Sequence, residues 1–155
     1  MELGLILGFL GAAISVFLSG IGSAKGVKVA GDAASGVTAE NPELFGKVLV
    51  MQLLPATQGI YGFLIGFIVL IKINIFGAMT IPTVTQGLSL LVGCLPVGVV
   101  CLVSGILQGK LAASCIGMVA RRPDQSGKGI TMTVMVETYA VLALLASFLM
   151  VWFAM

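Results

Sequence analysis

Glu137 is the one ionisable residue in an apolar segment that runs from residue 129 to residue 155. A charged side chain at the centre of a bilayer costs about 2.5 to 3.5 kcal/mol even on a lenient insertion scale. No apolar segment supplies a Lys or Arg to pair with it, and Lys128 is nine residues away, beyond the reach of a short glutamate. The carboxylate therefore needs a proton or a bound cation to neutralise it.

A second polar anomaly interrupts the apolar segment 48–71. Pro55 has no N–H, so the carbonyl four residues earlier loses its helical donor, and the helix should kink or open there. Gln58 and Tyr61 are three residues apart and share a helix face with Leu54. Amide, hydroxyl and loosened carbonyl oxygens at this point could face an ion.

The depth of these groups in the membrane can be compared, because a helix rises about 1.5 Å per residue. Counted from Lys128, Lys47 and Arg121 respectively, Glu137, Gln58 and Gln108 lie roughly 14, 17 and 20 Å along their helices. Each polar residue alone is more typical of an interhelical hydrogen bond worth about 0.6 kcal/mol. Their convergence with an unpaired carboxylate instead favours an ion site.

The residue types at this level also indicate which ion it would be. An all-oxygen ligand set suits a hard cation rather than a transition metal. One carboxylate makes a neutral site with a monovalent ion, whereas calcium would require a second carboxylate and magnesium more water. The residues therefore favour Na+, since a proton alone would leave Thr57, Gln58 and Gln108 without a role. The chain has no histidine, so a Ser/His/Asp or Cys/His nucleophile is excluded.

Composition shows which elements must position these groups. Hydrophobic residues make up 59% of the 155 residues and charged residues 9%, which is far from a soluble domain. Residues 3–24, 48–71 and 73–109 carry no charge, and about 20 apolar residues cross a bilayer. We expect an all-α membrane protein with four transmembrane helices, the first and third projecting beyond the bilayer. The predicted helices are residues 3–40, 44–72, 84–119 and 127–154.

The basic residues predict how the chain is oriented. Of the eight Lys and Arg residues, only Lys72 flanks the middle connection, and the other seven lie in the first and third connections. Because basic loops stay in the cytoplasm, both termini are expected outside the cytoplasm, in a multi-pass protein of the cell membrane. The start lacks the basic residues of a signal peptide, so we expect the first segment to be retained. Acidic residues interrupt the basic ones, which argues against a nucleic-acid partner and for contact with lipid.

The chain contains an internal duplication. Two tandem parallel hairpins, residues 1–72 and 73–155, resemble each other with an offset of 85 on the first helix and 81 on the second. The identities are Ser19, Gly20, Ile21 and Lys25 with Ser104, Gly105, Ile106 and Lys110, and Pro42, Gly46, Lys47, Met51, Thr57, Leu64 and Phe67 with Pro123, Gly127, Lys128, Met132, Thr138, Leu145 and Phe148.

The duplication is unequal at the ion site. Ala56 stands opposite Glu137, and Ser23 stands opposite Gln108. Two hairpins therefore share one carboxylate.

Small residues recur at every fourth position on the first and third helices. Such stripes allow close helix contact in lipid. They predict packing beyond one chain, with packing inside one chain as the open alternative. The stripes are Gly11, Ser15, Ser19 and Ser23, and Gly105, Gly109, Ala113 and Gly117.

Four motifs together resemble one family over the whole chain: SGIGSAKG at 19–26, QLLPATQGIYGF at 52–63, SGILQGK at 104–110 and MVETYA at 135–140. They are similar to the proteolipid subunits of sodium-translocating V-type ATPases. The resemblance implies a rotor ring with the odd helices inside and the even helices outside. It also implies a non-catalytic subunit, with ATP hydrolysis on other subunits.

The resemblance further implies a site and partners. A stator membrane subunit of the a/I type would supply an arginine that displaces the ion, and a central-stalk subunit would meet the cytoplasmic loops of the homo-oligomeric ring. Ala56 stands where close relatives can carry glycine, a harmless departure. The sodium ligands implied are the Leu54 carbonyl, Thr57, Gln58, Gln108 and Glu137, with Tyr61 hydrogen-bonded to the glutamate.

Other functions remain open at this point. A proton-translocating ring of the same type is the main alternative. A small four-helix proton-coupled antiporter also uses an intramembrane glutamate, but aromatic residues should line its site, and here Trp152 lies at the extreme end. A four-helix structural protein without an ion site is a further alternative.

Overall fold

The computed structural model describes residues 2–155, which form helices and contain no strand. Four helical segments are long and apolar enough to cross a membrane, as the sequence predicted. The second segment is divided by a short 3₁₀ turn. The helices are α1 (Leu3–Glu40), α2 (Phe45–Leu53), α3 (Thr57–Lys72), α4 (Val84–Arg121) and α5 (Ser126–Trp152).

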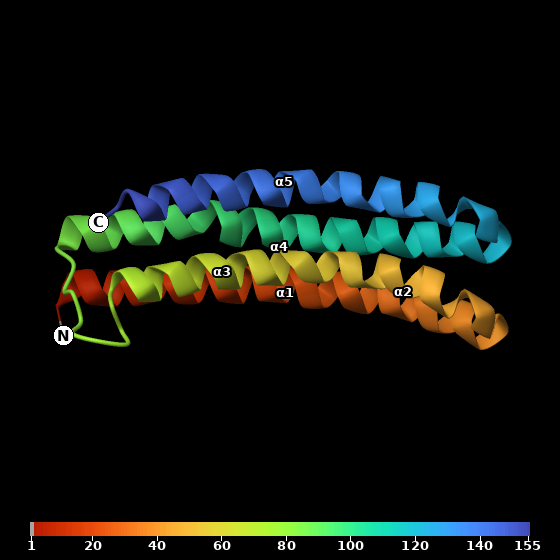
Figure 1. Cartoon of the computed structure of the whole chain (residues 1–155), viewed down its shortest axis with the longest axis horizontal. Coiled ribbons are helices and arrows are strands. Elements are labelled where there is room, and N and C mark those ends of the chain that lie inside the picture. Colours follow the sequence, from red (N-terminus) through yellow and green to blue (C-terminus); the bar gives the residue numbers. More distant parts are fainter. Residues whose placement is uncertain (1) are drawn as a thin grey trace.

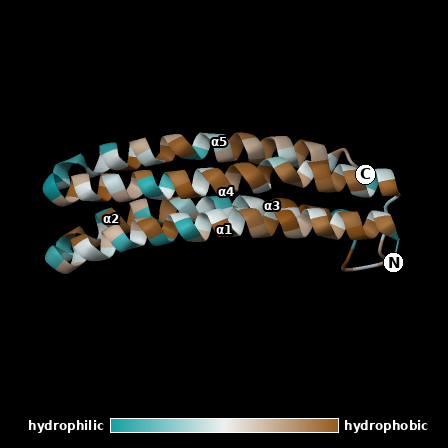
Figure 2. Ribbon diagram, turned by 180° about the vertical axis from the view of Figure 1, so that it is seen from behind, coloured by the Kyte–Doolittle hydropathy of each residue, from teal (hydrophilic) through white to brown (hydrophobic). Residues whose placement is uncertain are grey.

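The helices lie side by side as one elongated bundle (Figure 1). α1 packs most extensively against α4, α3 packs on α1, and α5 packs on α4. Both termini and the loop between α3 and α4 lie at one end, here called the terminal end, and the other two turns lie at the opposite turn end. Polar residues gather at the turn end (Figure 2). A helix of 38 residues, such as α1 or α4, is about 57 Å long. Both helices therefore exceed a hydrocarbon core of about 30 Å.

Glycines bring α1 and α4 into backbone contact. A Cβ atom added to Gly26 would lie 2.2 Å from the carbonyl oxygen of Gly105, and one added to Gly109 would lie 2.3 Å from Cα of Gly26. A Cβ atom on Gly62 of α3 would lie 1.8 Å from Oγ of Ser19. Much of both small-residue stripes thus packs inside one chain, the alternative that the sequence left open. Gly117 is different, because its added Cβ atom would meet open space.

Two prolines lie within the membrane-spanning segments, and one of them divides its segment. Leu54–Ala56 forms the 3₁₀ turn between α2 and α3, so the break predicted at Pro55 is confirmed. Pro96 lies inside α4, which continues unbroken through it. The N–H of Val97 donates to Oγ of the buried Ser147 on α5 at 2.9 Å. A side chain of one helix thereby satisfies a backbone group beside the proline of another.

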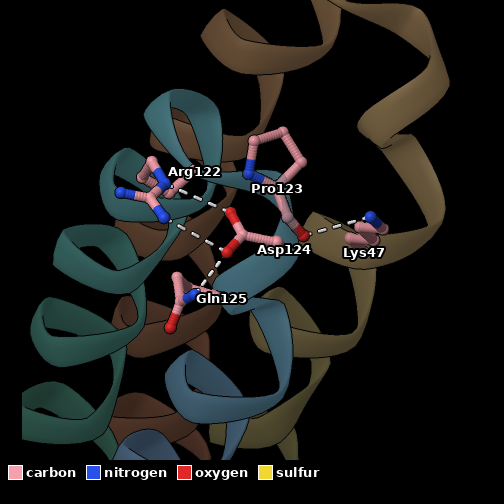
Figure 3. A network of polar contacts seen from close by, with 5 residues as sticks. All are labelled: Lys47, Arg122, Pro123, Asp124 and Gln125. Atoms are coloured by element: carbon pink, nitrogen blue, oxygen red, sulfur yellow. Dashed lines mark hydrogen bonds and ion pairs between the residues drawn. The ribbon is translucent and has the colours of Figure 1, made fainter.

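Polar contacts tie the two hairpins together at both ends. At the turn end, Nζ of Lys47 donates to the carbonyl of Pro123 at 3.1 Å (Figure 3). At the terminal end, Nζ of Lys72 donates to the carbonyls of Trp152 and, at 2.7 Å, Met155. The same ammonium lies 5.2 Å from the centroid of the Trp152 ring, within cation–π range. These contacts hold the ends of the bundle while the apolar middle is held by packing.

Candidate ion-binding site

The carboxylate of Glu137 lies at mid-length on α5 and is half-buried. The hydroxyl of Tyr61, on α3, donates to Oε1 at 2.5 Å. Nε2 of Gln108, on α4, lies 3.4 Å from Oε2 as a longer second donor. Three helices therefore meet at this carboxylate, and both of its oxygens face neutral donors.

No basic side chain among residues 2–155 pairs with Glu137. The ion pairs in that range join Lys28 to Asp32 at 2.6 Å and Arg122 to Asp124 at 3.2 Å, both on exposed surface. Neutral donors alone leave the negative charge uncompensated, and an uncompensated charge in an apolar environment is costly. The site therefore calls for a proton or a monovalent cation.

Two fully buried amides form the centre of the site. Nε2 of Gln58 donates to Oε1 of Gln108 at 2.5 Å. Nε2 of Gln108 also donates to the carbonyl of Thr133 on α5 at 3.1 Å. The two amides thus connect α3, α4 and α5 at one level, as the depth comparison predicted.

A cluster of oxygens lies beside the amides at the Pro55 turn. Oγ1 of Thr57 donates to the carbonyl of Leu54 at 2.8 Å and lies 3.5 Å from Oε1 of Gln58. The 3₁₀ turn causes this arrangement, because its i to i+3 bonding directs the Leu54 carbonyl towards Thr57. Carbonyl, hydroxyl and amide oxygens therefore converge on one side of the helix.

All six residues predicted for the site are in this one region, joined in a continuous chain of polar contacts. Gln58 presents its nitrogen to the oxygen of Gln108, so a cation bound by both amide oxygens requires the Gln58 amide to turn. The last side-chain torsion of glutamine is soft and roughly two-fold, which makes that rotation easy. The oxygens of the Leu54 carbonyl, the Thr57 hydroxyl, the amides and the carboxylate form a donor set that suits a hard cation.

Sequence reasoning missed two residues beside the site. Thr133 is buried and its carbonyl orients Gln108; its spacing of four residues from Glu137 was the available signal. Ser104 is also buried, one helical turn before Gln108. Its Oγ is the buried side-chain polar atom for which the described residues offer no hydrogen-bond partner. A small hydroxyl at this position resembles an ordinary packing residue, so its type alone could not mark it.

Comparison with known proteins places this geometry in a family. The model of the ATP synthase C-subunit family matches twice, at residues 10–69 and 91–150. The V-type sodium ATPase subunit K of Enterococcus hirae is 48% identical over 148 residues, which cover 96% of this chain and 92% of that protein. The A-type ATP synthase subunit K of Methanocaldococcus jannaschii is 40% identical over 140 residues, covering 89% of this chain but 60% of that protein. The chain is therefore a multi-pass membrane protein that belongs to the ATP synthase C-subunit family, whose members assemble into homo-oligomeric rings.

Proposed function

We propose that this chain is a rotor-ring subunit of a V-type ATPase and carries sodium ions across the membrane. The Leu54 carbonyl, Thr57, Gln58, Gln108 and Glu137 bind the ion, and Tyr61 holds the free carboxylate oxygen. ATP hydrolysis takes place on other subunits, so the chain transports without catalysing.

One observation supports this proposal most strongly. Glu137 has no cationic partner among the described residues, yet it is joined through Gln108 to a second buried amide. A proton would need the carboxylate and one acceptor, whereas the paired amides and the Thr57 hydroxyl supply further oxygens. The printed name of the Enterococcus hirae relative, a sodium ATPase subunit, agrees with this choice of ion.

The transport cycle follows from charge compensation. Sodium neutralises Glu137 while the site faces lipid or a neighbouring subunit, where an uncompensated charge costs several kcal/mol. When rotation brings the site to an arginine of an a/I-type stator subunit, that cation replaces sodium as the partner of the carboxylate and the ion leaves. The turn end faces the cytoplasm and a central-stalk subunit, and both termini lie outside.

Carbodiimide labelling tests the proposal on the detergent-purified protein. The oxygen of a protonated carboxyl group adds to the central carbon of dicyclohexylcarbodiimide while its proton passes to a nitrogen of the reagent, so at acidic pH Glu137 should be modified. Sodium should protect in proportion to its occupancy, with half-protection unaffected by potassium at equal ionic strength. Mass spectrometry of the modified peptide locates the label and gives the protected fraction.

Matched variants make the result specific. Glu137→Gln should remove the label, whereas Glu43→Gln, which alters an exposed carboxylate at the turn end, should leave labelling and protection intact. One bound sodium per chain at saturation should accompany protection. Equal protection by potassium, or no protection by sodium, would contradict the sodium assignment and favour a proton-carrying ring.

A further inference from the structure

One buried hydroxyl group beside the ion site has no hydrogen-bond partner within residues 2–155. It belongs to Ser104 of α4, which is 4% exposed. A buried hydroxyl without a partner destabilises a folded protein, so such groups are uncommon and each one requires an explanation. Alanine would fill the same space without that penalty. The hydroxyl of Ser104 therefore calls for a function.

The first hairpin contains a matched serine whose hydroxyl is satisfied. With the offset of 85 residues, Ser104 corresponds to Ser19 of α1. Ser19 is fully buried, and its Oγ donates to the carbonyl of Ser15, one turn earlier, at 2.6 Å. This bond to the preceding turn is a common way for a serine inside a helix to satisfy its hydroxyl. Ser104 makes no such bond with the corresponding carbonyl, that of Val100. The two serines differ in the hairpin that carries the acid.

The packing of α4 against α5 places Ser104 at the level of the carboxylate. The two helices run antiparallel, side by side (Figure 1), and Nε2 of Gln108 contacts the carbonyl of Thr133. Four residues, about one helical turn, separate Ser104 from Gln108, and four also separate Glu137 from Thr133. Both steps lead towards the terminal end. Ser104 therefore lies opposite Glu137, on the face of α4 that carries Gln108.

The carboxylate of Glu137 can accept a further donor. Its Oε1 accepts from the hydroxyl of Tyr61 at 2.5 Å, whereas Oε2 has only Nε2 of Gln108, at 3.4 Å. That second distance is longer than an ordinary hydrogen bond from nitrogen to oxygen. A carboxylate offers about four lone-pair sites on its two oxygens. Tyr61 and one cation fill two of them, which leaves room for a donor at Oε2.

We propose that the hydroxyl of Ser104 donates to Oε2 of Glu137 when the site carries sodium, and so holds the carboxylate against the ion. This inference rests on the ion site proposed above. Ser104 acts on the ion through the carboxylate and is therefore a positioning residue. One serine torsion with three staggered positions, together with the flexible glutamate side chain, brings the two groups together. A donor that bonds only in the loaded site stabilises that state over the empty one and raises the affinity for the ion.

Ser104→Ala separates this role from simple space filling. Removing a hydroxyl that has no partner should leave the thermal unfolding midpoint of the sodium-free protein in detergent unchanged or raised. The sodium concentration that gives half-protection of Glu137 against carbodiimide should nevertheless rise roughly tenfold, because a hydrogen bond to a charged group is lost. Equilibrium binding of radioactive sodium measures the same loss without the reagent. An unchanged sodium affinity in Ser104→Ala would overturn the proposal.

Two matched variants control for position and volume. Ser19→Ala removes the equivalent hydroxyl of the first hairpin and should bind sodium as the native chain does. Ser104→Cys keeps a side chain of similar size but replaces the hydroxyl with a weak donor, so it should weaken sodium binding nearly as much as Ser104→Ala. Native affinity in Ser104→Cys, or an equal loss in Ser19→Ala, would contradict a role for this particular hydroxyl.

Infrared spectroscopy reports on the carboxylate itself. Difference spectra recorded on adding sodium contain the carboxylate stretching bands of Glu137, which are assigned by their loss in Glu137→Gln. At saturating sodium these bands should shift in Ser104→Ala and stay at their native frequencies in Ser19→Ala. Native frequencies in Ser104→Ala would overturn the proposal.

The two proposals can fail separately. A native protein that sodium does not protect would contradict the ion site itself. Normal protection of the native protein, together with native behaviour of Ser104→Ala, would contradict only the role of Ser104.

Discussion

At the scale of single residues, the site rests on neutral groups that surround one acid. Tyr61 and Gln108 direct hydrogens at the carboxylate of Glu137, and Gln58 extends the network to the oxygens at the Pro55 turn. A buried amide loses its contacts with water and must find them in the protein. Each glutamine therefore satisfies a buried polar group of the other. Either one provides an amide oxygen for a cation once the hydrogen bond between them opens.

Replacing Gln58 should separate ion binding from carboxylate chemistry. Gln58→Leu removes one oxygen ligand of a charged ion, an interaction worth about 1.5 to 3 kcal/mol, so sodium affinity should fall roughly 10- to 100-fold. Carbodiimide should still label Glu137, because the carboxyl group remains. The measurement is the sodium concentration that gives half-protection. Gln52→Leu, on α2 and absent from the site's hydrogen bonds, is the matched control, and an equal loss there would contradict the ligand role.

At the scale of elements, glycines and prolines determine how the helices meet. The contact between α1 and α4 depends on positions without a Cβ atom, since in lipid close packing rather than hydrophobicity holds helices together. Pro55 breaks its segment at the Leu54–Ala56 turn, whereas α4 continues through Pro96 and the neighbouring Val97 N–H donates to Ser147 of α5.

Gly26→Ala should destabilise the bundle. Its Cβ atom would lie 2.2 Å from a backbone oxygen, so α1 and α4 must move apart at a cost of about 1 to 3 kcal/mol. Gly36→Ala places the same methyl group in open space on the same helix and should leave stability unchanged or slightly raised. Thermal unfolding in detergent compares the two variants. A similar loss in both would show that helix contact is not the cause.

Ser147→Ala should also destabilise the bundle, by about 1 to 3 kcal/mol, because the buried N–H of Val97 would lose its acceptor beside Pro96. Ser114→Ala removes an exposed hydroxyl that bonds the Lys110 carbonyl on the same helix and serves as the control. Unfolding midpoints of the two variants give the difference. No difference between them would mean that the Val97 N–H does not depend on the Ser147 hydroxyl for an acceptor.

At the scale of the whole molecule, an apolar body is closed at each end by polar contacts. The turn between α4 and α5 illustrates this, because Arg122 and Gln125 both contact the carboxylate of Asp124 (Figure 3). The hydrogen bond from Gln125, followed by that from Arg122, lowers the pKa of Asp124 below its ordinary value of 3.8. Lys47 reaches across from the other hairpin at the same place, so this turn joins both halves of the chain.

The pH dependence of this turn follows from the direction of that shift. A carboxyl group with a lower pKa in the folded chain stabilises the fold above its unfolded pKa, and the effect disappears as the pH falls through the folded pKa. At neutral pH, exchange of the backbone amides of Arg122 and Gln125 should therefore be faster in Asp124→Asn than in the native chain. The difference between the two proteins should vanish as the pH falls below the folded pKa. Equal protection of the two proteins at neutral pH would contradict a role for the carboxylate.

Much of the fold could be predicted because each segment that crosses the membrane must be long, apolar and uncharged, which can be seen in the local composition of the sequence. Long uncharged segments require spanning helices, since lipid offers no partner for backbone N–H and C=O groups. The break at Pro55 could also be predicted locally, because proline has no backbone N–H to donate within the helix. The polar site residues could be singled out because polar groups are rare and costly at that depth, whereas the Leu54 carbonyl was implied as a ligand by the family resemblance. The hydrogen bond from the Val97 N–H to Ser147 escaped prediction because the two residues lie 50 positions apart in the sequence.

The sequence by itself determined the four spans, the unpaired acid and the chemical types of the groups at its level, because each depends on the cost of placing particular residues in lipid. Only the tertiary structure decided which helices the small-residue stripes face, that Gln58 donates to Gln108, and that Thr133 orients the second amide. A stripe of small residues permits close approach of another helix but does not determine which helix that is. A side-chain amide can present either its oxygen or its nitrogen to a neighbour. Those choices depend on the relative positions of separate helices, which three-dimensional packing alone establishes.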